Sequence, residues 1–224
     1  MGLGSSGATA AATVYAINAL LGSPLEPIEL VRFAGLAEAL TAGAPHYDNV
    51  AASLLGGLVI LLNRKKPRIA RLRLPPGMRI VLFIPKTMVL RLLPGKAKTQ
   101  VMREVLPETI EHSDAVEWVE KAVALALGLS GADPYEAIKT INYGGPIEAT
   151  RAKLIPGYWE AKKEALQSGA LAFNISGAGP TLFAVVREGE EDQVMRRVSA
   201  VLEKYWGSLE ARVVDVDYDG ARLE

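Results

Sequence analysis

The first residues of the chain combine glycine and serine in a pattern that suits phosphate binding. Residues 2–7 read Gly-Leu-Gly-Ser-Ser-Gly, which matches G-x-G-x-x-G. Glycines let a backbone turn tightly and approach a ligand, and successive N–H groups can then surround an anion. A helix predicted over residues 8–21 would direct the positive end of its dipole to the same place. The residues alone leave two interpretations open, a phosphate-binding loop or a flexible N-terminus.

Other nucleotide-binding proteins share this glycine pattern, but their accompanying signals are missing. A dinucleotide site needs an acidic residue at the end of a strand about 20 residues later. The region around Glu26 and Glu29 reads instead as the start of a helix. The protein-kinase motifs H-R-D and D-F-G and the Walker lysine are also absent from the sequence, which argues against both of those classes.

A second polar cluster lies between two predicted helices. His46, Asp48 and Asn49 bring an imidazole, a carboxylate and an amide into one short segment. Such groups can hold a polar substrate, position a hydroxyl or accept a proton. The alternative is a solvated loop in which Asp48 caps a short helix that ends at Leu55.

Glu38 lies on the helix that precedes this cluster. It is either a solvated charge or, beside a phosphate loop, a ligand of Mg²⁺, because that ion commonly uses one or two carboxylates together with phosphate oxygens. A metal site built on histidine is not expected, since His46 and His112 are the only histidines of the sequence.

The composition is that of an ordinary globular protein. The 224 residues include 50% hydrophobic and 22% charged residues, and 25 basic residues balance 25 acidic ones. There is no cysteine, no apolar stretch as long as a membrane span and no pattern of a secretory signal. We therefore expect a cytoplasmic protein that binds neither nucleic acid nor membranes.

Hydrophobic periodicity predicts alternating helices and short strands. The predicted helices cover residues 8–21, 26–40, 48–55, 99–110, 113–129, 134–141, 157–168 and 190–205. The predicted strands cover residues 58–62, 69–74, 78–84, 171–176, 181–187 and 209–216. The first helix is apolar nearly all round and is expected to be buried, as is the first strand. Strands mixed with paired helices in the second half favour an α+β sandwich.

Four segments carry a family resemblance in their order along the chain. Residues 2–6 resemble the signature P-x-x-x-G-L-G-S-S-A-A, and residues 45–57 resemble G-H-x-D-N-V-A-x-x-L-L-G-G. Residues 151–157 resemble R-x-x-L-I-P-G, and residues 175–181 resemble a glycine-rich motif that packs against the phosphate loop. The first and last of these motifs are typical of GHMP kinases, which are ATP-dependent small-molecule kinases. The other two resemble the homoserine kinases within that family.

The resemblance implies a GHMP kinase fold of class α+β. Residues 1–63 would be the remnant of a ribosomal-protein-S5-domain-2-like N-terminal, ATP-binding domain. Residues 64–224 would be a C-terminal domain with a ferredoxin-like α+β sandwich. Family members carry a substantial part before the phosphate loop, so the resemblance also implies an N-terminally truncated chain or a gene start called too late. In that case the helix over residues 8–21 would have an uncovered face, and we expect poor solubility or unusual oligomerisation.

The resemblance also implies roles for individual residues. The phosphates of ATP would be wrapped by Gly2, Leu3, Gly4, Ser5, Ser6 and Gly7. Mg²⁺ would be held by Ser6 and Glu38. The pocket for L-homoserine would be lined by His46, Asp48, Asn49, Arg91 and Arg151. An arginine can grip the substrate carboxylate with two hydrogen bonds, although each arginine could instead be a surface charge. The segment that ends at Arg91 departs from the family pattern T-K-x-A-R.

The implied reaction is direct transfer of the γ-phosphate of ATP to the side-chain hydroxyl, which gives O-phospho-L-homoserine for threonine biosynthesis. Positioning and charge neutralisation dominate such reactions. Asn49 would position the hydroxyl, with Asp48 as the second candidate, and the two arginines complete the implied catalytic set. Two alternatives stay open: a GHMP kinase for mevalonate, shikimate or a sugar, and an inactive fragment that only binds nucleotide. The family also implies a homodimer.

Overall fold

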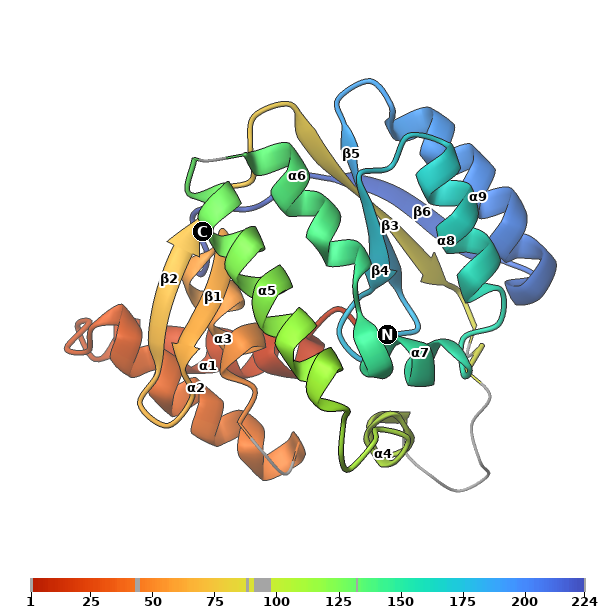
Figure 1. The fold of residues 1–224 in the computed structure, drawn as a ribbon. Helices are drawn as coiled ribbons and strands as arrows, with labels where there is room; N and C mark the ends of the chain where they lie inside the picture. Colours follow the sequence, from red (N-terminus) through yellow and green to blue (C-terminus); the bar gives the residue numbers. More distant parts are fainter. Residues whose placement is uncertain (1, 43–44, 88, 91–97, 132, 224) are drawn as a thin grey trace. The chain divides into compact units, whose positions relative to one another are not determined.

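A computed structural model describes residues 2–42, 45–87, 89–90, 98–131 and 133–223 (Figure 1). The chain divides into two compact units, which are treated separately. The helical unit comprises residues 4–74 and 216–224, and the sheet unit comprises residues 1–3 and 75–215. The phosphate-loop motif therefore begins in the sheet unit and continues into the helical unit.

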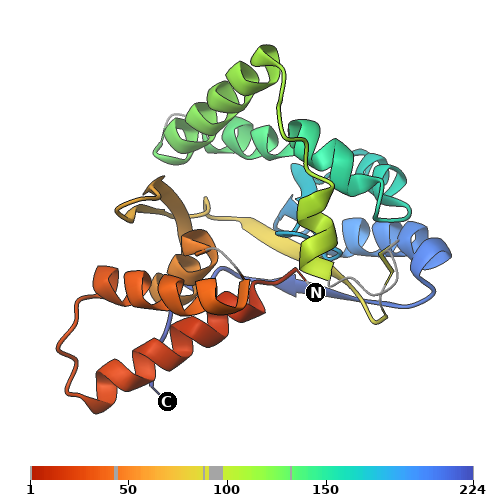
Figure 2. The same cartoon turned by 90° about the horizontal axis from the view of Figure 1, so that it is seen from below.

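The helical unit packs helices around a small apolar core and adds a two-stranded hairpin. Its elements are α1 (Ser5–Leu20), α2 (Pro27–Ala42), α3 (Tyr47–Leu55), β1 (Leu58–Asn63) and β2 (Arg68–Leu72). Helices α1 and α2 lie along each other (Figure 2). Val31, Ala34 and Val50 are fully buried where the three helices meet. The alanine-rich sequence of α1 favours a helix, and Pro27 suits the first position of α2, where its missing N–H costs no hydrogen bond.

The end of the chain returns to the helical unit. The carbonyl of Asp217 accepts a 2.7 Å hydrogen bond from the N–H of Gly57, and the carbonyl of Leu54 accepts one from Ala221. Gly56 has a φ of 66°, and a Cβ there would lie 2.7 Å from the backbone nitrogen of Gly220. Glycine is therefore needed at residue 56 both for its conformation and for the close approach of the C-terminal segment.

The sheet unit is built on four antiparallel strands. They are β3 (Met78–Pro85), β4 (Ala172–Ile175), β5 (Leu182–Arg187) and β6 (Leu209–Val214), in the order β4-β5-β3-β6. Helices α8 (Tyr158–Gln167) and α9 (Glu191–Trp206) lie side by side on one face (Figure 1). Their buried side chains form one core with Val81, Phe83 and Phe173 of the sheet. This βαββαβ arrangement is ferredoxin-like.

The connection from β3 to β4 holds the remaining helices. They are α4 (Lys98–Glu104), α5 (His112–Leu129), α6 (Pro134–Lys139), a 3₁₀ turn (Thr140–Asn142) and α7 (Gly145–Ala152). Asp133 caps α6, because its carboxylate accepts a 3.1 Å hydrogen bond from the N–H of Glu136. None of the helices in the described part of the chain is long and apolar enough to cross a membrane.

The α+β class and the ferredoxin-like sandwich are confirmed, while several local predictions are wrong. Helix α7 was not predicted, because Gly144-Gly145-Pro146 reads as a turn although proline suits the start of a helix. Helix α4 ends at Glu104 instead of residue 110. Strand β1 is half-buried or exposed throughout instead of buried, because it belongs to a two-stranded hairpin. Asp48 does not cap α3, which begins one residue earlier.

The predicted domain boundary does not coincide with the boundary between the compact units. The division into domains at residues 63 and 64 stays a prediction, but the compact units change at Pro75, because β2 pairs with β1 along its length.

Helix α1 was expected to be buried, yet Ile17 is 52% and Leu20 is 87% exposed, so this helix does have an uncovered apolar face. The expected poor solubility or unusual oligomerisation stays a prediction.

Candidate functional site

Helix α1 begins with a backbone that leaves its N-terminus open to a ligand. Gly4 precedes the helix with a φ of 68° and a ψ of 26°, the left-handed conformation that glycine adopts without strain. The first intrahelical hydrogen bond runs from the N–H of Ala8 to the carbonyl of Gly4. The N–H groups ahead of it have no partner within the helix, and the helix dipole makes this end attractive to anions.

The hydroxyl of Ser6 and the carboxylate of Glu38 meet beside this helix end. Ser6 Oγ donates a 2.9 Å hydrogen bond to Glu38 Oε1. Glu38 is only 2% exposed, and its Oε2 accepts a 3.2 Å hydrogen bond from the backbone N–H of His46. His46 Nδ1 lies 3.3 Å from Glu38 Oε1. Residues from the glycine loop, from α2 and from the 46–49 cluster therefore converge on one buried carboxylate.

These donors suit a magnesium ion that is also bound by phosphate and water. They do not suit a metal ion that is held by protein ligands alone. A hydroxyl and a carboxylate are hard oxygen donors, and Mg²⁺ is usually held by one or two carboxylates plus phosphate oxygens and water. Among the described residues, no group of three or more histidine, cysteine, aspartate or glutamate side chains could hold a metal. Ser6 and Glu38 are thus suited to a metal ion that arrives with a phosphate ligand.

Asn49 lies against the start of α1. A Cβ added to Gly7 would stand 2.9 Å from the Cβ of Asn49, and one added to Gly4 would stand 3.4 Å from its Oδ1. Asp48 is exposed in the first turn of α3. The two polar neighbours therefore differ, since Asn49 lies close to the glycine loop and Asp48 is open to solvent.

Tyr47 fixes the start of α3 from the buried side. Its ring lies over Gly35 of α2, where a Cβ would come within 2.2 Å of Tyr47 Cε1. Only glycine at residue 35 allows this contact, so the ring holds the 46–49 cluster against α2. Tyr47 was not among the site residues predicted from the sequence. A glycine in the interior of a predicted helix is the signal that could have revealed a close contact.

The beginning of the glycine loop packs within the sheet unit. The carbonyl of Gly2 accepts a 2.8 Å hydrogen bond from Ser176 Oγ. Gly2 has a φ of 99°, and a Cβ there would lie 2.7 Å from the carbonyl oxygens of Ser176 and Gly179. The turn over residues 176–179 therefore contacts the first residue of the loop, as the family resemblance implied. Ser176 was not among the predicted site residues.

Arg151 lies on α7 of the sheet unit. Its Nη1 donates a 3.1 Å hydrogen bond to the carbonyl of Gly177, and its Nε is buried without a hydrogen-bond partner. Burial lowers the pKa of the Arg151 guanidinium. Arg151 lines a pocket of about 380 Å³ together with Trp118, Ile147, Glu148, Asn174 and Phe183. The other predicted arginine, Arg91, lies outside the described residues.

Two family models and several curated relatives match this chain. Residues 1–57 match the GHMP kinases N terminal domain, and residues 135–204 match the GHMP kinases C terminal domain. The homoserine kinase of Thermoplasma acidophilum is 31% identical over 221 residues, which are 98% of this chain and 68% of that protein. The chain belongs to the GHMP kinase family. Within this family, several curated relatives at 31–38% identity are homoserine kinases.

Further relatives extend the comparison. The homoserine kinase of Pyrobaculum aerophilum is 37% identical over 204 residues, which are 91% of this chain. The chain spans 65% of that relative's length. Homoserine kinase from Cytophaga hutchinsonii has a similar crystal structure, with a TM-score of 0.82 and 31% identity over 98% of this chain and 67% of that one. A mevalonate kinase structure from L. major, at 14% identity and a TM-score of 0.70, shares the fold alone.

Each unit brings together some of the residues that the sequence analysis selected in this GHMP kinase. In the helical unit, Ser6, Glu38 and His46 are in contact, and Asn49 lies beside Gly4 and Gly7. In the sheet unit, Gly2 contacts the 176–179 turn, and Arg151 contacts Gly177. Glu148 and Asn174, which line the same pocket as Arg151, were missed, because they lie on α7 and β4 at positions that carry no motif.

Proposed function

We propose that the protein transfers the γ-phosphate of ATP to the side-chain hydroxyl of L-homoserine. The observation that carries this proposal is the 2.9 Å contact between Ser6 and the buried carboxylate of Glu38 at the start of α1, which also contacts His46. The similarity to homoserine kinases over about nine-tenths of the chain supports this choice of substrate.

The glycine loop and α1 would bind the triphosphate. Residues 2–7 would surround the phosphates with backbone N–H groups and the positive end of the helix dipole. Ser6 and Glu38 would hold Mg²⁺, which neutralises charge on the phosphates when it is bound. The hydrogen bond from the backbone N–H of His46 to Glu38 would keep the carboxylate in place.

Several of the residues selected from the sequence would bind the amino acid. Asn49 would position the substrate hydroxyl through its amide, with His46 and the exposed Asp48 as further contacts. Arg151 would bind the substrate carboxylate, because a guanidinium can grip a carboxylate through two hydrogen bonds. Arg91 is proposed as a second carboxylate ligand from the family pattern alone.

The proposed transfer forms a bond between the substrate oxygen and the γ-phosphorus and breaks the bond from that phosphorus to the β-phosphate oxygen, which leaves with ADP. The proton of the hydroxyl is released to bulk water, which completes the balance of the reaction. Catalysis would come first from alignment of the two substrates, which brings the reacting atoms together. It would also come from the positive end of α1, which favours the charge distribution of the transition state. As the family implies, we further propose a cytoplasmic enzyme that acts as a homodimer.

Phosphorus NMR of the protein with Mg-ATP and L-homoserine tests this function. Parallel samples contain mevalonate, shikimate or galactose in place of L-homoserine. We expect O-phosphohomoserine to be the main product. Phosphorylation of another acceptor would contradict the choice of substrate, and nucleotide binding by a folded protein that forms no product would contradict the catalytic proposal.

A further inference from the structure

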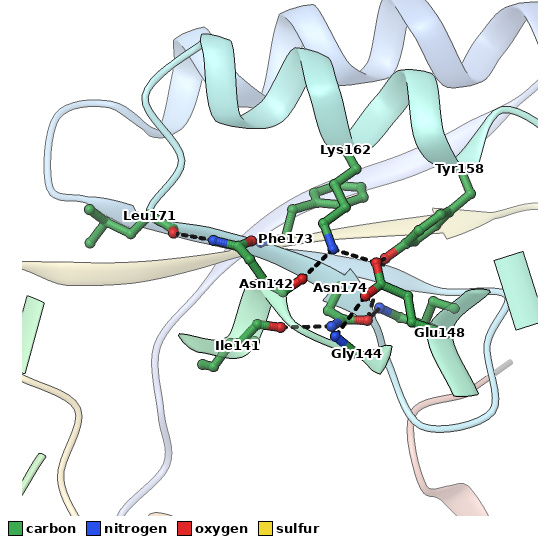
Figure 3. A network of polar contacts seen from close by, with 10 residues as sticks. Ile141, Asn142, Gly144, Glu148, Tyr158, Lys162, Leu171, Phe173 and Asn174 are labelled. Carbon is green, nitrogen blue, oxygen red and sulfur yellow. Dashed lines mark hydrogen bonds and ion pairs between the residues drawn. The ribbon is translucent and has the colours of Figure 1, made fainter. Parts of the chain in front are cut away.

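Glu148 is the centre of a buried polar network in the sheet unit (Figure 3). The side chain is 5% exposed and lies one turn into α7. Its Oε1 accepts a 2.5 Å hydrogen bond from the hydroxyl of Tyr158, and its Oε2 accepts a 2.8 Å hydrogen bond from the N–H of Gly144. It also forms an ion pair with Lys162 of α8, which is 8% exposed. The carboxylate therefore has a cation and two further donors.

The surroundings hold this network rigidly. Lys162 donates a second hydrogen bond, of 2.6 Å, to the carbonyl of Asn142. The side chain of Asn142 in turn bonds β4, because its amide donates to Leu171 and its oxygen accepts from the N–H of Phe173 (Figure 3). Burial, and then the hydrogen bond to Glu148, raises the pKa of Tyr158, so its hydroxyl stays a proton donor. Helix α7 is thus fixed to α8 and to the sheet.

Helix α7 carries both Glu148 and Arg151, so the network can affect the arginine. Glu148 and Arg151 are three residues apart on one helix, and side chains at this spacing are neighbours that readily form ion pairs. Both line the same pocket. Yet the carboxylate faces Lys162 and Tyr158, while Arg151 donates to the carbonyl of Gly177 and has a buried Nε without a partner. One carboxylate thus lies near two cations and is paired with Lys162.

We infer that Lys162 is a positioning residue, which pairs with Glu148 and so leaves the Arg151 guanidinium available to an anionic ligand. Without the ammonium group, the buried carboxylate would need another cation, because an unpaired buried charge is costly. Arg151 is the neighbour that can supply one. This role rests on the proposed function, in which Arg151 binds the carboxylate of the amino-acid substrate. Pairing of Lys162 with Glu148 would keep Arg151 free for that carboxylate.

Three variants separate this role from a merely structural one. Lys162→Met should let Glu148 capture Arg151 and raise KM for L-homoserine about tenfold, which corresponds to about 1.4 kcal/mol, with KM for ATP nearly unchanged. Glu148→Gln breaks the same ion pair but removes the competing charge, so its KM for L-homoserine should stay within about threefold of the wild type. The double variant Glu148→Gln/Lys162→Met should behave like Glu148→Gln. Lys163→Met, at the exposed neighbouring position of α8, is the matched control.

A measurement that needs no turnover tests the same inference. The side-chain Nε–Hε resonance of Arg151, assigned with Arg151→Lys, should shift in Lys162→Met and return in the double variant. A crystal structure of Lys162→Met should show Arg151 paired with Glu148. If the wild type does not phosphorylate homoserine, the proposed function fails while this measurement still decides the role of Lys162. An unchanged resonance in a folded Lys162→Met, or equal rises of KM in both single variants, would overturn the inference.

Discussion

Ser6 donates a 2.9 Å hydrogen bond to Glu38 although 32 positions separate the two residues along the chain. The contact exists because α1 and α2 lie along each other, and α2 carries Glu38 to the N-terminal end of α1. The same carboxylate accepts from the backbone of His46. The hydrogen bonds from Ser6 and from the backbone of His46 therefore hold the Glu38 carboxylate from two sides.

We predict that Glu38→Gln lowers kcat about 100-fold or more, because the amide keeps the shape of the carboxylate but lacks the charge needed to bind Mg²⁺. The glutamine oxygen can still accept from Ser6, but the amide nitrogen cannot accept from the backbone N–H of His46, so circular dichroism should accompany the assay to check that the fold is retained. Activity measured against Mg²⁺ concentration checks this prediction. Glu26→Gln, at an exposed position before α2, is the control and should match the wild type. Full activity of Glu38→Gln at low Mg²⁺ would contradict the proposed metal site.

We predict that Gly7→Ala destabilises the protein by about 1 kcal/mol and weakens homoserine binding. Alanine gains about 1 kcal/mol of helix propensity over glycine, but its Cβ would stand 2.9 Å from the Cβ of Asn49. Overpacking of this kind costs about 1–3 kcal/mol, so crowding outweighs propensity. Urea unfolding and KM for homoserine measure the two effects.

A control on the same helix separates propensity from crowding. Thr13→Ala changes an exposed residue of α1, so it gains helix propensity without a new contact and should be neutral or slightly stabilising. If Gly7→Ala stabilised the protein as Thr13→Ala does, α3 would have to yield to the added methyl group, and Asn49 would not be held tightly against α1.

Several residues that were selected from the sequence lie in contact in the helical unit, although their roles stay predictions. Ser6, Glu38 and His46 were selected for their residue types, and the structure brings them into contact. Asp48 was considered as a helix cap, but α3 starts at Tyr47 because that ring packs over Gly35, a contact that no local pattern encodes. Whether Asp48 or Asn49 serves the substrate stays a prediction.

The network around Glu148 could not be predicted from the sequence. Glu148, Tyr158 and Lys162 are spaced as any solvated helix face might be, and α7 itself was missed behind Gly144-Gly145-Pro146. Their burial follows from the packing of α8 against β4 and from the contacts of Glu148 with α8, which join residues far apart in the sequence. Arg151 was found only because it lies within a family motif.

We predict that Asn142→Ala costs about 2–4 kcal/mol of unfolding free energy, because its side chain bonds two backbone groups that otherwise lose their partners. They are the carbonyl of Leu171, at 2.9 Å, and the N–H of Phe173, at 2.8 Å. Among the strands of the described residues, β4 is at the edge of the sheet, so none of them is available on its outer side to replace these bonds. Urea unfolding measures the loss.

The control for Asn142 is Asn63→Ala. The side chain of Asn63 likewise bonds two backbone groups, because it accepts from the N–H groups of Lys65 and Lys66, but it does so in an exposed turn where water can replace it. Asn63→Ala should lower the unfolding free energy clearly less than Asn142→Ala does. Equal losses would mean that the bonds of Asn142 to β4 contribute no more than an exposed turn.

We predict that Asp217 stabilises the docked C-terminal segment in a pH-dependent way. The hydrogen bond from Arg222, then those from the N–H groups of Asp219 and Gly220, lower the pKa of Asp217 from 3.8 to about 2. A carboxyl whose pKa is lower in the folded state contributes stability above its unfolded pKa and loses it as the pH falls through the folded pKa. The contribution should therefore be complete above about pH 4 and vanish near about pH 2.

Thermal melts of Asp217→Asn and the wild type across this range test the prediction. The variant should melt at a lower temperature near neutral pH, and the gap should close as the pH falls from about 4 to about 2. Added salt should narrow the gap as well, because Asp217 and Arg222 are exposed and their attraction is screened. Asp219→Asn, which removes an exposed carboxylate two residues away, is the control and should show a smaller gap. A gap that stays constant down to about pH 2 would mean that the backbone of this segment, through Gly57 and Leu54, holds it without help from the Asp217 charge.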